Sequence, residues 1–247
     1  MASVDLRPGE RLDDLLIGGF KIIQDSRRFR FSLDAVLLGH FATVKRPAAV
    51  VDLGAGTGVL GLILAAHGAA RVTGVELSPE MAEMARRTID LNGLGDRLAV
   101  LTGDVRAIKG LLPAGSADLV VANPPYRLPG SGRESPRPEL AMARHELAGG
   151  LDDFVRAAAY LLKGRGRLAL VQLAERLPAI MAALAACSLA PKRLRLVHSA
   201  PDQAAKLVLI EAVAGGRPGL RVEAPLFVYD AAGGYTGEIL AYYQAGE

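Results

Sequence analysis

The sequence predicts an α/β fold in which a doubly wound, mostly parallel sheet of seven strands follows a small N-terminal extension. First, short apolar runs alternate with helical stretches of about ten to fifteen residues, as they do when crossover helices join parallel strands. Second, 51% of the 247 residues are hydrophobic and 22% are charged, which supports one sizeable core and argues against disorder. Third, glycine, proline and serine recur at the ends of the runs.

The first 45 residues differ from the alternating pattern that follows. Gly18 and Gly19 indicate a turn between two apolar runs. Ser32 is a suitable N-cap for an apolar helix over residues 33–41. We therefore expect residues 1–45 to form an extension of turn, strands and one helix, and residues 46–247 to form the main domain.

The elements of the main domain follow from its apolar runs and their boundaries. Gly68 and Gly93 mark helix ends, and Ser78 with Pro79 opens a helix as N-cap and first residue. Right-handed crossovers then bring the carboxyl ends of the strands to one edge, where ligands bind. The predicted strands cover residues 48–53, 71–76, 98–101, 118–122, 167–173, 194–197 and 206–213, and the predicted helices cover residues 59–67, 78–92, 151–162 and 175–187.

Two segments of the main domain carry no predicted element. Residues 127–144 are rich in proline, glycine, serine and arginine, which is typical of a long exposed loop. From residue 215 onward the chain is dense in aromatic residues but has no periodicity that assigns it.

Composition excludes several classes of protein. The single cysteine, Cys187, allows no disulfide framework within the chain, and the four histidines lack metal-ligand spacing, so we expect no metal. The N-terminus does not resemble a signal peptide, and the longest uncharged stretch, residues 177–191, is shorter than a membrane span. We expect a cytoplasmic protein without a membrane segment. A net charge of +3 and a pI of about 9.1 are compatible with a nucleic-acid partner without requiring one.

A glycine-rich turn between the first strand and first helix of the main domain carries the first functional signal. Within residues 52–58, Gly54 and Gly56 allow a tight turn and a close approach of backbone to a ligand. Glu76 ends the next strand, where its carboxylate can accept hydrogen bonds from two ribose hydroxyls. The same pattern matches the dinucleotide fingerprint, so a nicotinamide-dependent oxidoreductase stays open, as does a turn that binds nothing.

Two carboxylates favour S-adenosylmethionine over a dinucleotide. Asp52 lies directly before the glycines, where it would repel a pyrophosphate but attract the ammonium and sulfonium charges of S-adenosylmethionine. Asp104 follows the third strand, where it can accept a hydrogen bond from the adenine amine while Val105 covers the ring.

The segment Asn-Pro-Pro-Tyr at residues 123–126 follows the fourth strand, at the same predicted edge. An exocyclic amine on a conjugated ring or amide is a poor nucleophile, because its lone pair is delocalised. The side-chain carbonyl of Asn123 and the backbone carbonyl of Pro124 can accept its two hydrogens and orient the nitrogen. Tyr126 can stack on a planar substrate. The segment therefore predicts transfer to a planar amine, against the alternative of a proline-rich turn that only ends a strand.

These motifs resemble those of class I methyltransferases in order and register over about residues 48–125. Residues 15–24 and 31–38 are similar to the opening of a bacterial family that methylates N6 of the adenine beside the anticodon of a valine tRNA, in which this region closes over the cofactor. The resemblance implies a Rossmann-like methyltransferase fold and S-adenosylmethionine as cofactor. It implies that the cofactor is bound by Phe31, Ser32, Asp34, Asp52, Gly54, Gly56, Glu76, Leu77, Asp104, Val105 and Asn123, and that catalysis depends on Asn123, Pro124 and Tyr126.

The expected activity is thus N-methylation of a planar exocyclic amine, with adenine N6 of a tRNA as the leading substrate and structured RNA as the partner. Ribosomal RNA guanine N2 and a protein glutamine amide stay open as acceptors. A nicotinamide-dependent oxidoreductase and a non-catalytic RNA-binding protein stay open as other classes.

Three groups of basic residues are candidates for contacts with RNA phosphates. A run of charge is more often only a solvated face, and the loop after Tyr126 is the best candidate because it adjoins the proposed acceptor site. The groups are Arg27, Arg28 and Arg30; Arg127, Arg133, Arg137 and Arg144; and Lys192, Arg193 and Arg195.

Overall fold

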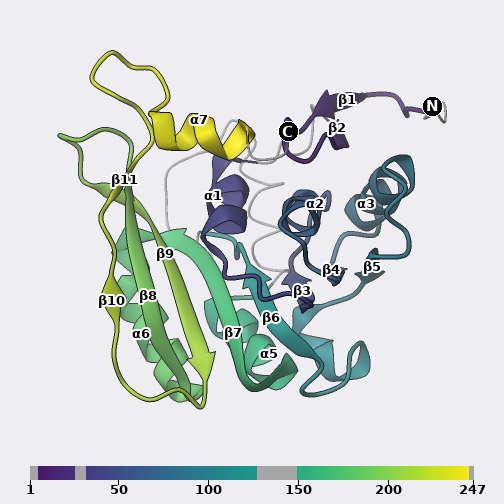
Figure 1. Cartoon of the computed structure of the whole chain (residues 1–247). Helices are drawn as coiled ribbons and strands as arrows, with labels where there is room; N and C mark the ends of the chain where they lie inside the picture. Colours follow the sequence, from purple (N-terminus) through teal and green to yellow (C-terminus); the bar gives the residue numbers. More distant parts are fainter. Residues whose placement is uncertain (1–4, 26–31, 127–148, 245–247) are drawn as a thin grey trace.

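A twisted central sheet dominates the computed structural model, which describes residues 5–25, 32–126 and 149–244 (Figure 1). Within these residues the sheet has nine strands in the order β10-β8-β9-β7-β6-β3-β4-β5, with β11 also pairing with β8. The strands are β3 (Ala49–Leu53), β4 (Arg71–Glu76), β5 (Leu98–Thr102), β6 (Ala117–Ala122), β7 (Leu162–Leu173), β8 (Leu189–His198), β9 (Ala205–Ala214), β10 (Arg221–Val222) and β11 (Leu226–Phe227).

The sheet is mostly parallel, as the sequence predicts. Of the strands in the described ranges, only β9 runs against its neighbours in this sheet, pairing antiparallel with both β7 and β8. The seven predicted strands are all present, but the count of seven is wrong, because β10 and β11 add to the edge strand β8. Each has only two residues, which is too short for a period in the sequence to reveal.

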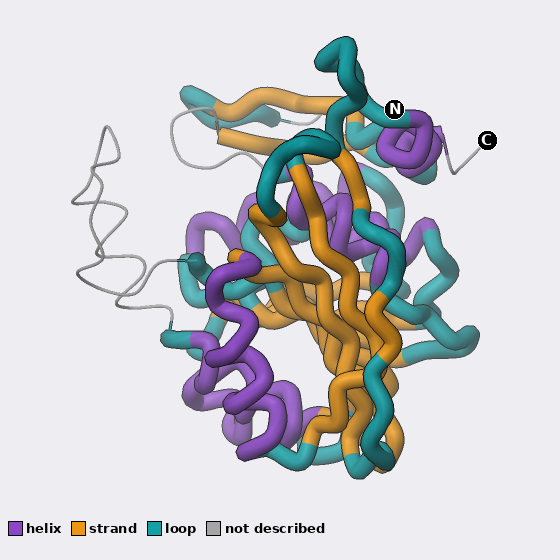
Figure 2. The backbone as a smooth tube through the Cα atoms, turned by 90° about the vertical axis from the view of Figure 1, so that its left-hand side faces the viewer, coloured by secondary structure: helices purple, strands orange, loops and turns teal. Residues whose placement is uncertain are grey.

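Helices cover both faces of the sheet, so that two hydrophobic clusters flank it (Figure 2). One face carries α1 (Leu33–Phe41), α2 (Val59–Ala66) and α3 (Pro79–Leu91), and the other carries α5 (Leu151–Leu161), α6 (Leu177–Ala186) and the 3₁₀ turn η1 (Val105–Gly110). Val50 and Val121 point into the first cluster, whereas Val51 and Ala122 point into the second. This alternation is what a strand covered on both sides requires.

The N-terminal residues form a hairpin that is fastened to α3. Strand β1 (Glu10–Asp14) pairs antiparallel with β2 (Lys21–Asp25). Asn92 accepts from the Lys21 backbone N–H at 2.9 Å and donates to the Lys21 carbonyl at 2.7 Å, and Thr88 accepts from the Ile23 N–H at 3.2 Å. Helix α1 packs within the first cluster itself, so the N-terminal segment and the sheet share one core.

The aromatic tail completes the same face. Helix α7 (Gly237–Gln244) lies above the end of the sheet near α1 (Figure 1). The ring of Tyr242 stacks on that of His40 in α1, with centroids 4.2 Å apart, and Ile239 is fully buried in the first cluster. The tail therefore closes the core over α1 and extends the sheet beyond β8.

Candidate functional site

Four parallel strand ends place the predicted site residues along one edge of the sheet. Leu53 of β3 pairs with Ala122 of β6, so the glycine turn and the Asn123 turn leave the sheet side by side. Glu76 of β4 pairs with Thr102 of β5, two residues before Asp104. The structure thus brings together the segments that the sequence assigned to cofactor and acceptor.

The glycine turn is held tightly against the sheet. Gly54, Gly56 and Gly58 all have positive φ, at 77°, 57° and 84°, a conformation that strongly favours glycine. The backbone N–H of Gly54 donates to the Val75 carbonyl at 2.8 Å. A Cβ on Gly54 would also lie 3.2 Å from the Phe154 ring. Backbone geometry therefore strongly favours glycine at this position, and the Phe154 ring leaves little room for a side chain.

Glu76 anchors this turn. One of its oxygens accepts from the Gly56 N–H and the other from the Ser78 N–H, each at 2.8 Å. Ser78 in turn caps α3, accepting from the Met81 N–H, as the sequence predicts. Since each carboxylate oxygen has a second lone pair, the pair of ribose hydroxyls could still donate to Glu76.

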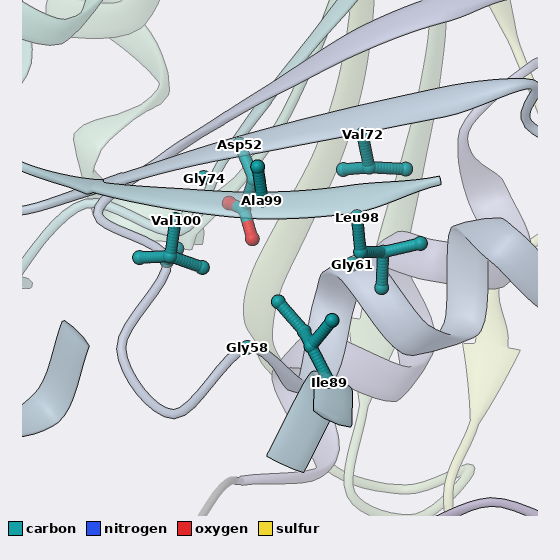
Figure 3. A pocket seen from close by; sticks show the side chains of 10 residues that line it. Asp52, Gly58, Gly61, Val72, Gly74, Ile89, Leu98, Ala99 and Val100 are labelled. Atoms are coloured by element: carbon teal, nitrogen blue, oxygen red, sulfur yellow. The ribbon is translucent and has the colours of Figure 1, made fainter. Parts of the chain in front are cut away.

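Asp52 is a buried carboxylate with an unsatisfied oxygen. Only 2% of the residue is exposed, and its Oδ2 has no hydrogen-bond partner among the described residues. It faces a small pocket between the sheet and helices α2 and α3, whose lining includes Gly58, Gly74 and Ile89 (Figure 3). Burial raises the pKa of Asp52 to about 7, and the nearby charge of Glu76 adds to the effect. A positive charge close to Asp52 would lower this pKa again and keep the carboxylate ionised.

Asp104 and Val105, which were expected to contact the adenine, already contact other residues in this structure. Asp104 caps η1 and receives the Arg106 guanidinium, with contacts of 2.9 Å from Nε and 2.5 Å from Nη2. This hydrogen bonding holds the pKa of Asp104 below its usual value. Val105 is buried in the second hydrophobic cluster, and Leu77 is half-buried. An adenine amine would therefore share Asp104 with Arg106.

The Asn-Pro-Pro-Tyr turn is tied to α1. Asn123 is half-buried directly after β6, and Pro124 is buried. The Tyr126 hydroxyl donates to Asp34 Oδ2 at 2.5 Å. Burial, followed by the Asp34 charge, raises the pKa of Tyr126, so the hydroxyl stays protonated and can donate. Asp34, which the resemblance placed near the methionine end, thus contacts the acceptor motif.

Two other residues predicted by the resemblance lie before Asp34. Ser32 is the N-cap residue of α1, although its side chain makes no capping hydrogen bond within the described part of the chain. Phe31 lies outside the described residues.

The sequence motifs did not identify two residues of the site, Gly74 and Gln172. Gly74 lies within β4, and a Cβ there would be 2.7 Å from the Ala55 Cβ, so only glycine lets the turn approach the sheet. A glycine inside an apolar strand is a usable signal of such an approach. Gln172 is fully buried near the end of β7, and its side-chain amide donates to the Pro125 carbonyl at 3.5 Å. A lone polar residue among Leu, Val and Ala was the available signal.

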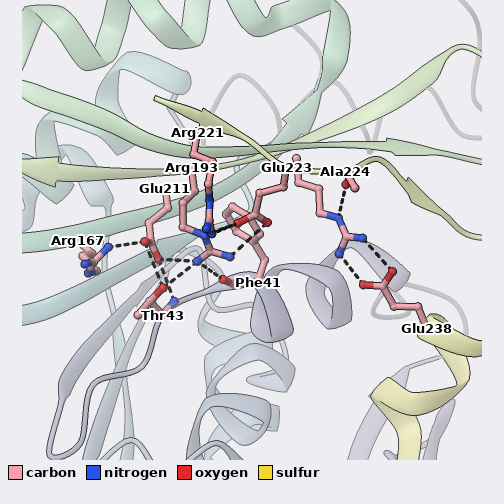
Figure 4. A network of polar contacts seen from close by, with 10 residues as sticks. Phe41, Thr43, Arg167, Arg193, Glu211, Arg221, Glu223, Ala224 and Glu238 are labelled. Carbon is pink, nitrogen blue, oxygen red and sulfur yellow. Dashed lines mark hydrogen bonds and ion pairs between the residues drawn. The ribbon is translucent and has the colours of Figure 1, made fainter. Parts of the chain in front are cut away.

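In one predicted basic group, Arg193 and Arg195 are ion-paired within the fold. Arg193 contacts the buried Glu211 at 3.6 Å and Glu223 at 2.8 Å, and Arg195 forms two contacts of 2.5 and 2.8 Å with Glu238 (Figure 4). These arginines join the tail to β8 and already pair with carboxylates, and contact of either one with RNA phosphates stays a prediction. The groups Arg27, Arg28 and Arg30, and Arg127, Arg133, Arg137 and Arg144, lie outside the described residues.

Two further expectations concern absences. Among residues 5–25, 32–126 and 149–244, no helix is both long and apolar enough to cross a bilayer. In the same part of the chain, no group of three or more histidine, cysteine, aspartate or glutamate side chains is arranged to hold a metal ion.

Comparisons with known proteins agree with this geometry. Residues 50–130 match a family model described as a methyltransferase domain. A tRNA1(Val) (adenine(37)-N6)-methyltransferase of Porphyromonas gingivalis is 34% identical over 199 residues, which cover 78% of this chain and 77% of the relative. One of the same description from Tolumonas auensis is 30% identical, covering 90% of this chain and 91% of the relative.

Solved structures share the fold. A predicted O-methyltransferase from Agrobacterium tumefaciens, protein Atu636, superimposes with a TM-score of 0.70 at 28% identity, covering 86% of this chain and 96% of that one. TYW2 of P. horikoshii in complex with MeSAdo has a TM-score of 0.60 at 17% identity, covering 84% of this chain and 72% of that one.

The sequence similarity to these relatives supports the interpretation of the motifs more strongly than a shared fold alone would. Their identity extends over most of both chains, beyond the span of the glycine turn and strands that many α/β proteins have in common. The oxidoreductase that the glycine pattern left open is therefore set aside, and the chain is an enzyme, a methyltransferase. It belongs to the family of tRNA1(Val) (adenine(37)-N6)-methyltransferases.

Proposed function

We propose that this enzyme uses S-adenosylmethionine to methylate N6 of the anticodon-loop adenine at position 37 of a valine tRNA. The observation that carries the proposal is the pairing of β3 with β6, which sets the glycine turn beside the Asn123 turn. A methyl donor held by the first and an amine held by the second would meet at one edge of the sheet. A tRNA substrate also implies that the enzyme works in the cytoplasm.

The cofactor half of the site has the groups that S-adenosylmethionine needs. Glu76 is available to the ribose hydroxyls, and the unsatisfied oxygen of Asp52 favours positive charge in its vicinity. The positive φ values of Gly54 and Gly56 keep the turn free of side chains on that path. S-adenosylmethionine, when bound, supplies a methyl group attached to a positively charged sulfur.

The acceptor half orients a weak nucleophile. The Asn123 side-chain carbonyl and the Pro124 backbone carbonyl accept the two hydrogens of the amine, which aims its nitrogen and raises its electron density. Tyr126 stacks on the base, which offsets part of the few kcal/mol that extrusion of a base requires. Because the methylated nitrogen gives up a proton readily, no side chain has to act as a strong base.

The N-terminal segment is proposed to cover the cofactor. Helix α1 begins beside the acceptor turn, as the bond from Tyr126 to Asp34 requires. The hairpin is fastened to the last turn and C-cap of α3, through Thr88 and Asn92. The end of the segment that begins α1 therefore lies beside the acceptor half, while its hairpin packs along the helix that begins next to Glu76.

One experiment separates the acceptors. The enzyme is incubated with labelled S-adenosylmethionine and total tRNA from a strain lacking its gene, and the nucleosides are analysed by mass spectrometry. N6-methyladenosine in a valine tRNA is expected. Label in guanine N2 of ribosomal RNA, in a protein glutamine or on a hydroxyl group would contradict the proposed substrate, and calorimetric binding of NAD without S-adenosylmethionine would contradict the cofactor.

A further inference from the structure

Side chains from both faces of the sheet form hydrogen bonds with the Asn-Pro-Pro-Tyr turn. Asp34 belongs to α1, which covers the face of the first hydrophobic cluster, and it holds the Tyr126 hydroxyl. Gln172 lies in β7 two residues after Leu170, which points into the second cluster. Because side chains two apart in a strand share a face, Gln172 approaches the turn from the side of α5 and α6.

The register of the sheet explains why Gln172 reaches the turn. Leu170 pairs with Ala122 in the parallel β6–β7 ladder. Two residues further along each strand are Gln172 and Pro124, so the amide stands beside the turn as it leaves the sheet. There the Gln172 amide nitrogen donates to the Pro125 carbonyl at 3.5 Å, while its oxygen accepts from the Leu173 N–H at 2.9 Å.

Core packing alone does not explain why the buried residue 172 is a glutamine. Gln172 is fully buried, and the residues beside it in the strand are apolar. Burying a polar side chain costs free energy unless its polar groups are hydrogen-bonded. Among the residues that the structure describes, its one hydrogen bond to a distant part of the chain is with the backbone of the turn. The peptide unit that it holds joins Pro125 to Tyr126, and the carbonyl proposed to accept the amine belongs to the preceding Pro124.

We propose that Gln172 is a positioning residue for methyl transfer, fixing the Pro125–Tyr126 peptide so that the Pro124 carbonyl and the Asn123 side chain face the incoming amine. It touches neither cofactor nor substrate. The proposal rests on the proposed function, since it assigns Gln172 a part in aligning that acceptor. A misplacement of about 1 Å in such a site is enough to slow turnover by about 100-fold.

The test compares two replacements of Gln172 across pH, using the full chain, S-adenosylmethionine and tRNA from a strain lacking the gene. Gln172→Met keeps similar bulk but has no donor, so turnover should fall about 10- to 100-fold at every pH, with affinity for S-adenosylmethionine within about twofold of the original enzyme. Gln172→Glu can donate only when its carboxyl is protonated. Its turnover relative to the original enzyme should be highest at low pH and fall about tenfold per pH unit above the pKa of the new carboxyl, down to the level of Gln172→Met.

The matched control is Gln203→Glu, which adds the same charge at an exposed position and should leave turnover unchanged at every pH. If Gln172→Met does not fold, Gln172→Asn replaces it, since it keeps the amide but withdraws it from the Pro125 carbonyl. A pH-independent effect of Gln172→Glu, or full turnover in Gln172→Met or Gln172→Asn, would overturn the inference. Failure of the original enzyme to methylate tRNA would instead overturn the proposed function.

Discussion

The two halves of the candidate site are assembled from different distances along the chain. The cofactor half is nearly local, since residues 52–58 and Glu76 belong to consecutive elements and bond to one another. The acceptor half begins with an equally short motif at residues 123–126, but its contacts come from Asp34, 92 residues away from Tyr126, and Gln172, 47 residues away from Pro125. A short motif can therefore define a chemistry while tertiary contacts define its alignment.

Because the two halves are built separately, we expect mutations in them to change different quantities. Damage to the glycine turn or to Glu76 should act mainly on cofactor affinity, whereas damage to the acceptor turn should act mainly on the rate at saturating cofactor. The predictions for Asn123 and Glu76 test whether the halves are separable in this sense, and those for Asp52 and Tyr126 test one group within each half.

The largest effect is expected for Asn123→Ala. Removal of the side-chain carbonyl leaves one hydrogen of the amine without an acceptor, and turnover should fall about 100- to 1000-fold. Affinity for S-adenosylmethionine, measured by calorimetry, should change by less than about threefold. An equal loss of turnover and cofactor affinity would show that the two halves are not separable.

Glu76→Gln should damage the other half. A glutamine has one acceptor oxygen where Glu76 uses two, so either Gly56 or Ser78 loses its bond and the ribose loses a charged partner. Cofactor affinity is expected to fall about 10- to 100-fold, with turnover at saturating cofactor reduced much less. Glu80→Gln removes the same charge from an exposed position of α3 and serves as the control. Cofactor affinity unchanged in Glu76→Gln would remove Glu76 from the site.

Asp52→Asn should change stability with pH. Burial raises the pKa of Asp52 to about 7 from an ordinary value of 3.8, so the folded state binds the proton more tightly than the unfolded state. The burial penalty is therefore absent below about pH 4 and grows as pH rises towards 7.

The free energy of unfolding measured without cofactor should be about 4 kcal/mol higher for Asp52→Asn than for the original protein at pH 8, and nearly equal at pH 4. Asp90→Asn, an exposed change on α3, should show no such difference. A stability gain that is the same at both pH values would mean that ionisation of Asp52 is not its cause.

The smallest effect concerns Tyr126. If the ring stacks on a base, Tyr126→Ala should raise the KM for tRNA about tenfold or more. Tyr126→Phe keeps the ring and loses only the bond to Asp34, so a change of about threefold to fivefold is expected. Equal losses in steady-state kinetics for the two variants would argue that the hydroxyl, and not the ring, matters.

The comparison also explains what could be predicted from sequence. The alternation of runs predicts all seven long strands, and Ser78 with Pro79 predicts the start of α3, because these signals are local. The tail was not assigned, since β10 and β11 exist only by pairing with β8. Arg193 and Arg195 have the same sequence signature as phosphate ligands, and only the fold supplies their partners Glu211, Glu223 and Glu238.

The site residues also divide into those that a local motif predicts and those that tertiary packing places. Glycine requirements at residues 54 and 56 and the position of Glu76 follow from a motif of fixed spacing. By contrast, the bond between Asp34 and Tyr126 could not be predicted, because the packing of α1 decides which of its side chains face the edge of the sheet. The expected contact of Asp34 with the cofactor stays a prediction.

The central claim is that the glycine turn and the Asn123 turn present a methyl donor and a planar amine to each other. A crystal structure with bound S-adenosylhomocysteine tests it most directly. The sulfur should lie between the turn of residues 54–58 and the Asn123 side chain, with both ribose hydroxyls on Glu76. A ligand whose sulfur faces away from Asn123, or whose ribose lies elsewhere, would contradict the account.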